Sequence, residues 1–362
     1  MIDFQPSEEQ QLIIETVRGF ARNEVRAAAR ECDETAKLPD ALLAAAHELG
    51  LVANALPEAH GGGGARSAVT GALVAEELAW GDLALAVAIL SPSLLALPVA
   101  EFGTDEQRSR LLPRFSGPAF APGSLAVVEP RFDSDPFRPR TRARRDGDAY
   151  VLAGRKCLVP WLDGGDPLLV VADEGGTAQA FLVPRDARGL AAAPDRYMGL
   201  QALPTAELTL DGVRLPAAAR LGGEAGADVR RIVNQGRVGL AAMAVGVARA
   251  AFEIARDYAR QREAFGGPIA AKQAIAFKLA DMAIEIDGAR LLAWEAAWKL
   301  DQGGDATREA ALAIDQARQV SLEVADGAVQ VLGGHGYTRE YLPEMHLRNA
   351  RGFAVFEALT LV

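Results

Sequence analysis

Glu357 is the carboxylate in this sequence whose surroundings best suit a general base. It lies between the apolar runs Phe353–Phe356 and Ala358–Leu359. A carboxylate held among apolar side chains is partly desolvated, and desolvated titratable groups are concentrated at catalytic sites. On its own, a glutamate in such a segment is more often a solvated residue on a helix surface. Glu357 is therefore a candidate for proton transfer whose role depends on its surroundings.

Other patterns of chemically active residue types do not complete a catalytic motif. The run His60–Gly63 could form an oxyanion loop, but that chemistry needs a Gly-x-Ser-x-Gly turn, which the sequence lacks. A phosphate-binding Gly-x-x-x-x-Gly-Lys-Ser/Thr loop is also missing, and the glycines at 333, 334 and 336 follow a helical pattern instead of a strand. The four histidines lack metal-ligand spacing. We therefore expect a surface turn at His60–Gly63 and no metal site.

Charge and composition exclude several classes of function. The 362 residues include 38 Lys and Arg against 48 Asp and Glu, a net charge of −10, which argues against nucleic-acid and anionic-membrane partners. The cysteines Cys32 and Cys157 cannot form a disulfide framework. The apolar stretch Leu83–Ala100 contains Pro92 and Pro98 and does not resemble a membrane span. The acidic, polar N-terminal region is not typical of a secretory signal, so we expect a cytoplasmic protein.

The elements that must position the candidate residues fall into three zones, which predict a multidomain α+β protein. Residues 1–122 are predicted to form an α-helical domain, in which Ser7 and Gln10 form a possible capping box. Residues 123–222 alternate short apolar runs with turn formers, a rhythm typical of a small antiparallel β-domain. Residues 223–362 return to helical periodicity.

Segments in all three zones resemble the acyl-CoA dehydrogenase family, in the order in which that family carries them. The matching segments are Pro57–Gly62, Phe102–Gln107, Leu112–Pro113, Met198–Leu200, Pro204–Pro216, Tyr258–Gly266, Gln273–Phe277, Leu279–Ala283 and Gln330–Tyr337. The resemblance implies an N-terminal α-helical domain, a small middle antiparallel β-domain and a C-terminal four-helix bundle. It also implies a tetramer, a dimer of dimers in which FAD lies across subunits.

The resemblance also implies an activity for the candidate base. Glu357 matches the residue that removes the α-proton of an acyl-CoA thioester while the β-hydrogen leaves as hydride to FAD. Arg237 matches a substrate-binding arginine near the active site, on the helix that binds CoA. Ser134 matches a loop serine that contacts the cofactor and the substrate. An electron-transfer flavoprotein would accept the electrons. The family's alternative position for the base holds Gly236, which cannot serve.

A second group of residues matches FAD contacts that the family makes across the dimer. Arg262 suits the pyrophosphate because its guanidinium presents a fixed fork of donors. The other members of this group are Phe265, Gln273, Gln330 and Gly334.

The sequence departs from the family pattern around the flavin ring. Val128 replaces a threonine, and Asp133 replaces a glycine and introduces a negative charge. The segment Leu158–Pro160 replaces Trp-Ile-Thr, so the hydroxyl that would reach the flavin is missing, although the nearby Trp161 could substitute in packing. After Glu357 the sequence has Ala-Leu in place of Gly-Thr, and the family's closing helix is not represented.

Three functions remain open from the sequence. The first is a catalytic, FAD-dependent acyl-CoA dehydrogenase. The second, favoured by the departures, is a flavin-poor partner subunit of a heterotetrameric acyl-CoA dehydrogenase that acts on a bulky acyl or sterol side-chain CoA. The third is a flavoprotein of this fold with oxidase or non-thioester chemistry. The acyl group cannot be deduced, because small residues within Val87–Leu95 permit a roomy pocket but also suit ordinary core packing.

Overall fold

The structure, a computed structural model, describes residues 4–362, which form seven α-helices, seven strands and four more α-helices in chain order. The first helices are α1 (Glu8–Phe20), α2 (Arg26–Thr35), α3 (Asp40–Glu48), α4 (Ala68–Gly81), α5 (Leu83–Leu90), α6 (Ser93–Phe102) and α7 (Asp105–Leu111). The strands are β1 (Leu125–Ala126), β2 (Arg142–Asp146), β3 (Ala149–Pro160), β4 (Leu168–Glu174), β5 (Thr177–Val183), β6 (Leu190–Pro194) and β7 (Thr205–Pro216). The last helices are α8 (Val229–Gln261), α9 (Gln273–Asp301), α10 (Thr307–Leu332) and α11 (Pro343–Gly352). The predicted order of helices, sheet and helices is confirmed.

The start of α1 follows from local side chains. Ser7 accepts a hydrogen bond from the N–H of Gln10, and the Gln10 side chain accepts one from the N–H of Ser7. Thr104 and Gln107 form the same reciprocal pair at the start of α7. Each capping box satisfies two N–H groups near the helix start that the helix itself leaves unpaired.

Helix α4 is largely buried in the helical core and carries two buried carboxylates, Glu76 and Glu77. Arg249 of α8 donates to both, with its closest contact to Glu77 at 2.7 Å. Arg18 of α1 also donates to Glu77, and Arg290 of α9 donates to Glu76. Buried charges require partners, so this network ties four helices together.

The sheet is mixed, whereas the sequence pattern predicts an antiparallel one. Its strand order is β1-β4-β2-β3-β7-β6, with β5 paired to β4. Strand β1 pairs with β4 in parallel, and β2 does so at one position, while the remaining pairs are antiparallel. The two residues of β1 are too few to show an alternating pattern. One core lies within the sheet region, and a second, larger core runs through the helices.

Two long apolar stretches belong to the interior. Leu83–Phe102 comprises α5 and α6, which are separated at Ser91–Pro92, as the interruption in the sequence indicates. By length and composition this stretch and Val229–Gln261 could each cross a membrane, but 94% and 78% of their apolar windows are buried inside the protein. Such burial is what core helices show.

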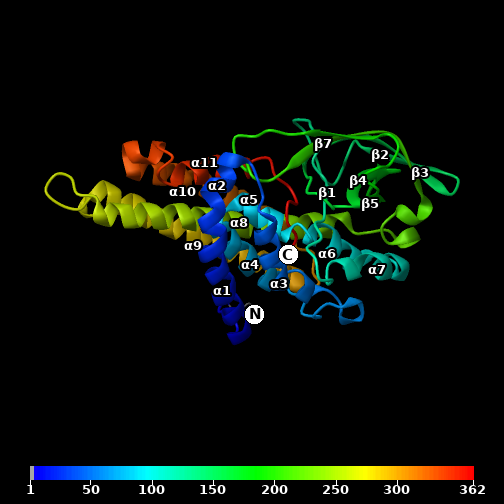
Figure 1. Ribbon diagram of the computed structural model, residues 1–362, viewed down its shortest axis with the longest axis horizontal. Coiled ribbons are helices and arrows are strands. Elements are labelled where there is room, and N and C mark those ends of the chain that lie inside the picture. The colour runs from blue at the N-terminus through cyan, green and yellow to red at the C-terminus, as the bar shows by residue number, and fades with distance from the viewer. Residues whose placement is uncertain (1–3) are drawn as a thin grey trace.

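The long helix α8 separates two ends of the molecule. Figure 1 shows the strands gathered near one end of α8, and the connection from α8 to α9 at the opposite end. Its 33 residues span about 50 Å at about 1.5 Å per residue. We propose domain boundaries at 122/123 and 222/223, which fall before β1 and between β7 and α8.

Candidate active site

Glu357 lies just beyond α11 and is held by arginines from two helices. Arg237 of α8 donates from Nε to Oε2 at 3.0 Å and from Nη2 to Oε1 at 3.2 Å. Arg318 of α10 donates to Oε1 at 3.4 Å and to the carbonyl of Phe356 at 2.7 Å. The Glu357 side chain is 16% exposed. A carboxylate offers about four lone-pair sites, so these contacts fix its orientation and leave capacity for a proton.

Packing and a hydrogen bond fix the chain that leads from α11 to Glu357. The Phe356 ring lies against Gly352, where an added Cβ would come within 2.2 Å of the ring. Asn349 of α11 accepts a hydrogen bond from the N–H of Leu200 at 2.8 Å, which ties α11 to the loop before β7. The site is therefore positioned by the C-terminal helices and the sheet region together.

Phe137, from the loop between β1 and β2, completes the surroundings of Arg237. Its ring centre lies 5.1 Å from the Arg237 guanidinium and 5.2 Å from that of Arg230. Cation–π attraction acts at these separations. Arg237 is thus bound by a carboxylate and faces an aromatic ring.

The buried carboxylate of Glu129 holds the two ends of the β1–β2 loop together through hydrogen bonds. This carboxylate accepts the N–H of Arg140 at 3.0 Å, the N–H of Thr141 at 2.7 Å and the ammonium of Lys156 at 3.1 Å. Burial lowers the pKa of Lys156 to about 8, although Glu129 opposes this shift. Ser134 accepts the N–H of Glu129 at 3.1 Å. Ser134 therefore helps to shape the loop, and its cofactor and substrate contacts stay predictions.

Asp133, in the same loop, is exposed and forms ion pairs with two arginines. Its side chain is 64% exposed and pairs with Arg131 and with Arg140, the latter at 3.2 Å. Hydrogen bonding from Arg131 holds the pKa of Asp133 below its usual value. The negative charge expected from the sequence is therefore offset by two neighbouring arginines.

The alternative base position is closed by packing. Gly236, next to Arg237 on α8, faces Ala358, and a Cβ at Gly236 would lie 2.6 Å from the Ala358 Cα. No larger side chain fits there without displacing the backbone after Glu357. Position 236 therefore has no room for a carboxylate side chain.

The segment Leu158–Pro160 is buried within the chain. Leu158 adopts a left-handed conformation with φ 58° at a register shift in the pairing of β3 with β7. The hydroxyl of Ser124 donates to the carbonyl of Pro160 at 2.6 Å. The guanidinium of Arg185 lies 3.8 Å from the ring centre of Trp161. Arg185 therefore already covers one face of the ring that the sequence suggests for flavin packing.

Arg262 and Gly334 lie together at the far end of α8. With Tyr258 and His335 they line a cavity of about 570 Å³. The hydroxyl of Tyr258 and Nδ1 of His335 form a hydrogen bond of 2.8 Å, which fixes one wall. Phe265, on the loop that follows, has φ 52° and is 95% exposed.

The remaining expected cofactor residues lie on the helices that meet at this end. Gln273 is the first residue of α9, Gln330 lies in the last turn of α10, and both are exposed. We call the residues expected to bind FAD here the helical-end group: Arg262, Phe265, Gln273, Gln330 and Gly334.

The helical-end group is distant from Glu357. Arg237 and Arg262 are 25 residues apart along α8, from 237 to 262, which corresponds to about 38 Å. Figure 1 shows the two ends of α8 on opposite sides of the molecule. This separation exceeds the length of an FAD molecule. The structure therefore brings Glu357 and Arg237 together, but it does not bring the helical-end group to the same place in one chain.

The helical-end group fits part of FAD by its chemistry. Within residues 4–362, no side-chain partner engages the Arg262 guanidinium, so its donor fork can bind a pyrophosphate. The exposed ring of Phe265 can pack on an aromatic system. At the other end, Leu158–Pro160 presents no hydroxyl to a flavin ring. The fit is good for the diphosphate side of FAD and incomplete on the ring side.

Two residues of the site were not found by sequence reasoning. Phe137 follows a proline in a loop, and nothing in its spacing connects it to α8. Arg318 is one of several polar residues on α10, a pattern that usually marks a solvated face. Only the tertiary contacts with Arg237 and Glu357 distinguish them.

Two family models match the two helical parts of the chain. "Acyl-CoA dehydrogenase, N-terminal domain" matches residues 7–117, and "Acyl-CoA dehydrogenase, C-terminal domain" matches residues 226–357. Glu357 is the last residue of the second match. Residues 118–225, which include the sheet, lie between the matches.

Individual relatives agree with the family models. The chain is 38% identical to the probable acyl-CoA dehydrogenase YngJ of Bacillus subtilis, over 97% of this chain and 94% of that protein. A chain in a solved structure concerning the electron transferring flavoprotein of Acidaminococcus fermentans has 31% identity and a TM-score of 0.89, covering 98% of this chain and 95% of that one. A glutaryl-CoA dehydrogenase from Mycobacterium smegmatis, solved with FADH2, has 31% identity and a TM-score of 0.87, covering 97% and 91%. The chain belongs to the acyl-CoA dehydrogenase family of FAD-dependent oxidoreductases.

Proposed function

We propose that this protein is an acyl-CoA dehydrogenase that introduces an α,β double bond into an acyl-CoA thioester, with Glu357 as the base. The observation that carries the proposal is the bidentate pair between Glu357 and Arg237, at the junction of α8, α10 and the β1–β2 loop. This arrangement holds one largely buried carboxylate in a fixed orientation. Such a group is suited to removing a carbon-bound proton.

The chain's own residues have distinct tasks in this mechanism. Glu357 takes the α-proton, while Arg237 and Arg318 keep its carboxylate oriented. Phe137 covers one side of Arg237 and limits the positions the guanidinium can adopt. When bound, FAD supplies the acceptor for the hydride that leaves the β-carbon.

We further propose that FAD is held between subunits. The distance along α8 requires that the helical-end group of one copy serve the Glu357 site of another chain. A tetramer of this chain, or of this chain with a relative, satisfies that requirement. The similarity to a structure concerning an electron transferring flavoprotein supports a protein of that class as the electron acceptor.

The substitution Glu357→Gln tests the proposed base. We expect flavin reduction by butyryl-CoA or palmitoyl-CoA to slow by about 10²–10⁴-fold, because glutamine keeps the shape but cannot accept the proton. Rapid-mixing absorbance of the bound flavin measures this rate. Glu295→Gln, at an exposed position on α9, is the matched control and should reduce the flavin at the unmodified rate. Equal rates in both variants would show that the base lies elsewhere.

A second candidate function is supported by the sheet side of the site. The buried segment Leu158–Pro160 offers no hydroxyl, and Arg185 covers Trp161. These features favour a flavin-poor subunit whose related partner chain supplies the flavin-ring contacts, acting on a bulky acyl or sterol side-chain CoA. Absorbance of the chain purified alone separates the two functions. A full flavin complement with turnover excludes the partner-subunit function, whereas a colourless chain that gains FAD only with a relative excludes the homomeric enzyme.

A further inference from the structure

Arg318 of α10 contacts the backbone just before Glu357 as well as the Glu357 carboxylate. Its Nη2 donates to the carbonyl of Phe356 at 2.7 Å and to Oε1 of Glu357 at 3.4 Å. The first distance is that of a strong hydrogen bond from a charged donor, whereas the second is long. The carbonyl of Phe356 is therefore the main acceptor of the Arg318 guanidinium.

The Phe356 carbonyl is held in place by packing and by the backbone. Phe356 is 4% exposed, and its ring centre lies 6.0 Å from that of the fully buried Phe353. The N–H of Phe356 donates to the carbonyl of Gly352 at 3.2 Å, just beyond the end of α11. Arg318 therefore binds a carbonyl whose residue is fixed on its own account.

The peptide between Phe356 and Glu357 connects this contact to the proposed base. The peptide is trans, and in a trans peptide the C=O and the following N–H point in opposite directions. Because the C=O is held toward Arg318, the N–H of Glu357 points away from α10. Within residues 4–362, no hydrogen-bond acceptor engages this N–H. The chain thus presents a free donor on the same residue as the proposed base.

The positive charge of Arg318 also affects the strength of this donor. A hydrogen bond accepted by a peptide carbonyl polarises the peptide and makes its N–H a better donor, most of all when the partner is charged. The Nε of Arg318 is buried and has no partner in the described part of the chain. Such an unpaired group is unfavourable for folding, so stability alone does not account for an arginine here.

We propose that Arg318 is a positioning residue of the reaction, which aims and strengthens the Glu357 N–H as a hydrogen-bond donor to the carbonyl oxygen of the acyl-CoA thioester. The inference rests on the proposed function, because it takes Glu357 as the base. When Glu357 takes the α-proton, the electron pair of the broken C–H bond moves toward that oxygen. A fixed donor stabilises the charge that develops there. Arg318 acts only through the peptide.

The infrared absorption of a bound thioester tests this role. The probe is butyryl-CoA with an isotope label at the thioester carbonyl, bound to the holoenzyme that carries Glu357→Gln and cannot remove its proton. A hydrogen bond to the carbonyl oxygen lowers its stretching frequency. We expect a shift to lower frequency on binding, and the loss of at least half of this shift when Arg318→Leu is added. Arg318→Lys should restore part of the shift, because an ammonium can still donate to the Phe356 carbonyl.

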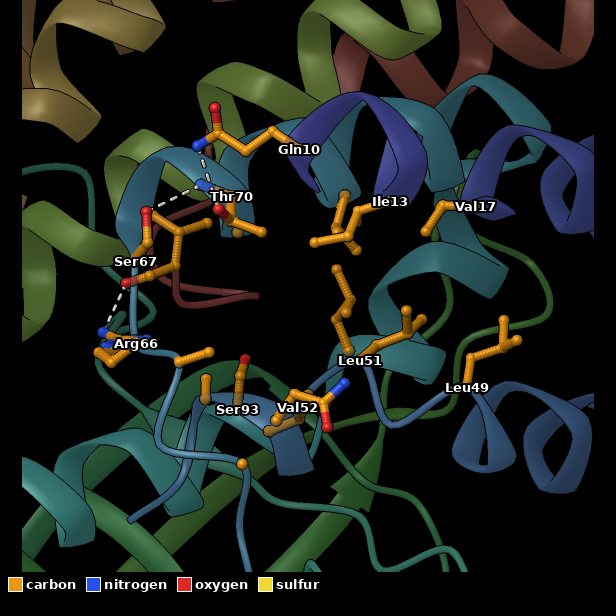
Figure 2. A pocket seen from close by; sticks show the side chains of 18 of the residues that line it. Gln10, Ile13, Val17, Leu49, Leu51, Val52, Arg66, Ser67, Thr70 and Ser93 are labelled. Carbon is orange, nitrogen blue, oxygen red and sulfur yellow. Dashed lines mark hydrogen bonds between the residues drawn. The ribbon is translucent and has the colours of Figure 1, made fainter. Parts of the chain in front are cut away.

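A cavity of about 680 Å³ elsewhere in the protein provides one control. Figure 2 shows Gln10 of α1 and Thr70 of α4 at this cavity, where the Gln10 amide donates to the Thr70 hydroxyl at 3.3 Å. Both residues line the cavity, whereas Arg318 and Glu357 do not. Thr70→Val removes this link between two helices and leaves the contacts of Glu357 in place. It should keep the full infrared shift.

Arg308→Leu, at an exposed position on the same helix as Arg318, is the second control and should also keep the full shift. A full shift in Arg318→Leu would overturn the role of Arg318, and so would a lysine variant no better than the leucine variant. If no shift occurs even with Arg318 present, the Glu357 N–H is not the donor. If Arg318→Leu does not fold, Arg318→Met keeps the length of the side chain and gives the same test.

Flavin reduction in chains that retain Glu357 gives a second measurement. Arg318→Leu should slow reduction at saturating butyryl-CoA by about 10- to 100-fold while the Kd of the thioester changes little, because the donor contributes most when charge develops. A merely structural loss would weaken binding as well.

The inference and the proposed function can fail separately. Slow reduction in Glu357→Gln with an unchanged infrared shift in Arg318→Leu would retain the base and remove the role of Arg318. Unaltered reduction in Glu357→Gln would remove the base, whatever the infrared result.

Discussion

In the proposed mechanism, Arg237 positions the base, Glu357, through contacts with its carboxylate. The Arg237 guanidinium donates two hydrogen bonds to the Glu357 carboxylate and so fixes the plane of that carboxylate. The ring of Phe137 lies beside the guanidinium and limits its movement. A lysine at this position would keep the charge but lose the planar, two-point contact. Orientation and charge can therefore be tested separately.

The substitution Arg237→Lys should slow flavin reduction at saturating acyl-CoA by about 10- to 100-fold, because the carboxylate loses its fixed orientation. The pH profile of the rate should change as well, which a merely structural loss would not produce. Arg230→Lys is the matched control, since Arg230 also faces Phe137 but does not donate to Glu357. An equal loss in both variants would assign the effect to the aromatic contact instead.

At the scale of elements, the buried carboxylates Glu76 and Glu77 of α4 link neighbouring helices through hydrogen bonds from arginines. Burial raises the pKa of Glu77, but hydrogen bonds from Arg249 and Arg18 outweigh burial and hold the pKa below its usual value of 4.5. Ionised Glu77 therefore favours the folded state. This contribution is complete above about pH 4.5 and is lost as the pH falls through the lower folded value.

The substitution Arg249→Leu should lower the free energy of unfolding by about 3–5 kcal/mol, because it leaves buried carboxylates without their main partner. It should also make the loss of stability below pH 4.5 shallower than in the unmodified protein. Urea unfolding followed by circular dichroism at several pH values measures both effects. Arg308→Leu, at an exposed position on α10, should change the stability by less than about 0.5 kcal/mol. A similar small change for Arg249→Leu would contradict the network's role.

The elements also show what the sequence could and could not predict. Helix α1 begins at its predicted capping box because that signal is local. The parallel pairing of β1 was not predictable, because two residues carry no periodicity. Glu357 and Arg237 were reached through motif resemblance, whereas Phe137 and Arg318 depend on contacts between segments far apart in the chain. The burial of Ala358–Val362 was not predicted, although four of these five residues are apolar and such a run is typical of a buried segment.

For the whole molecule, the question is which chain completes each flavin site. Arg262→Ala should lower the FAD content per chain of the purified assembly while leaving the fold intact, because the exposed fork is lost from a surface position. The ratio of flavin to protein absorbance measures this content. Arg260→Ala, two residues earlier on α8 and also exposed, is the control and should retain FAD. Full FAD content in Arg262→Ala would show that the helical-end group does not bind the cofactor.

The length of α8 has an evolutionary consequence. If FAD is held between subunits as proposed, Glu357 and the helical-end group, about 38 Å apart in one chain, serve different catalytic centres. Selection then acts on each of them through a different neighbouring subunit. After a gene duplication, one copy can lose one half while its sister preserves the complementary half. The proposed partner-subunit function predicts such an uneven pattern, in which the Arg262 end matches the family and the Leu158–Pro160 segment departs from it.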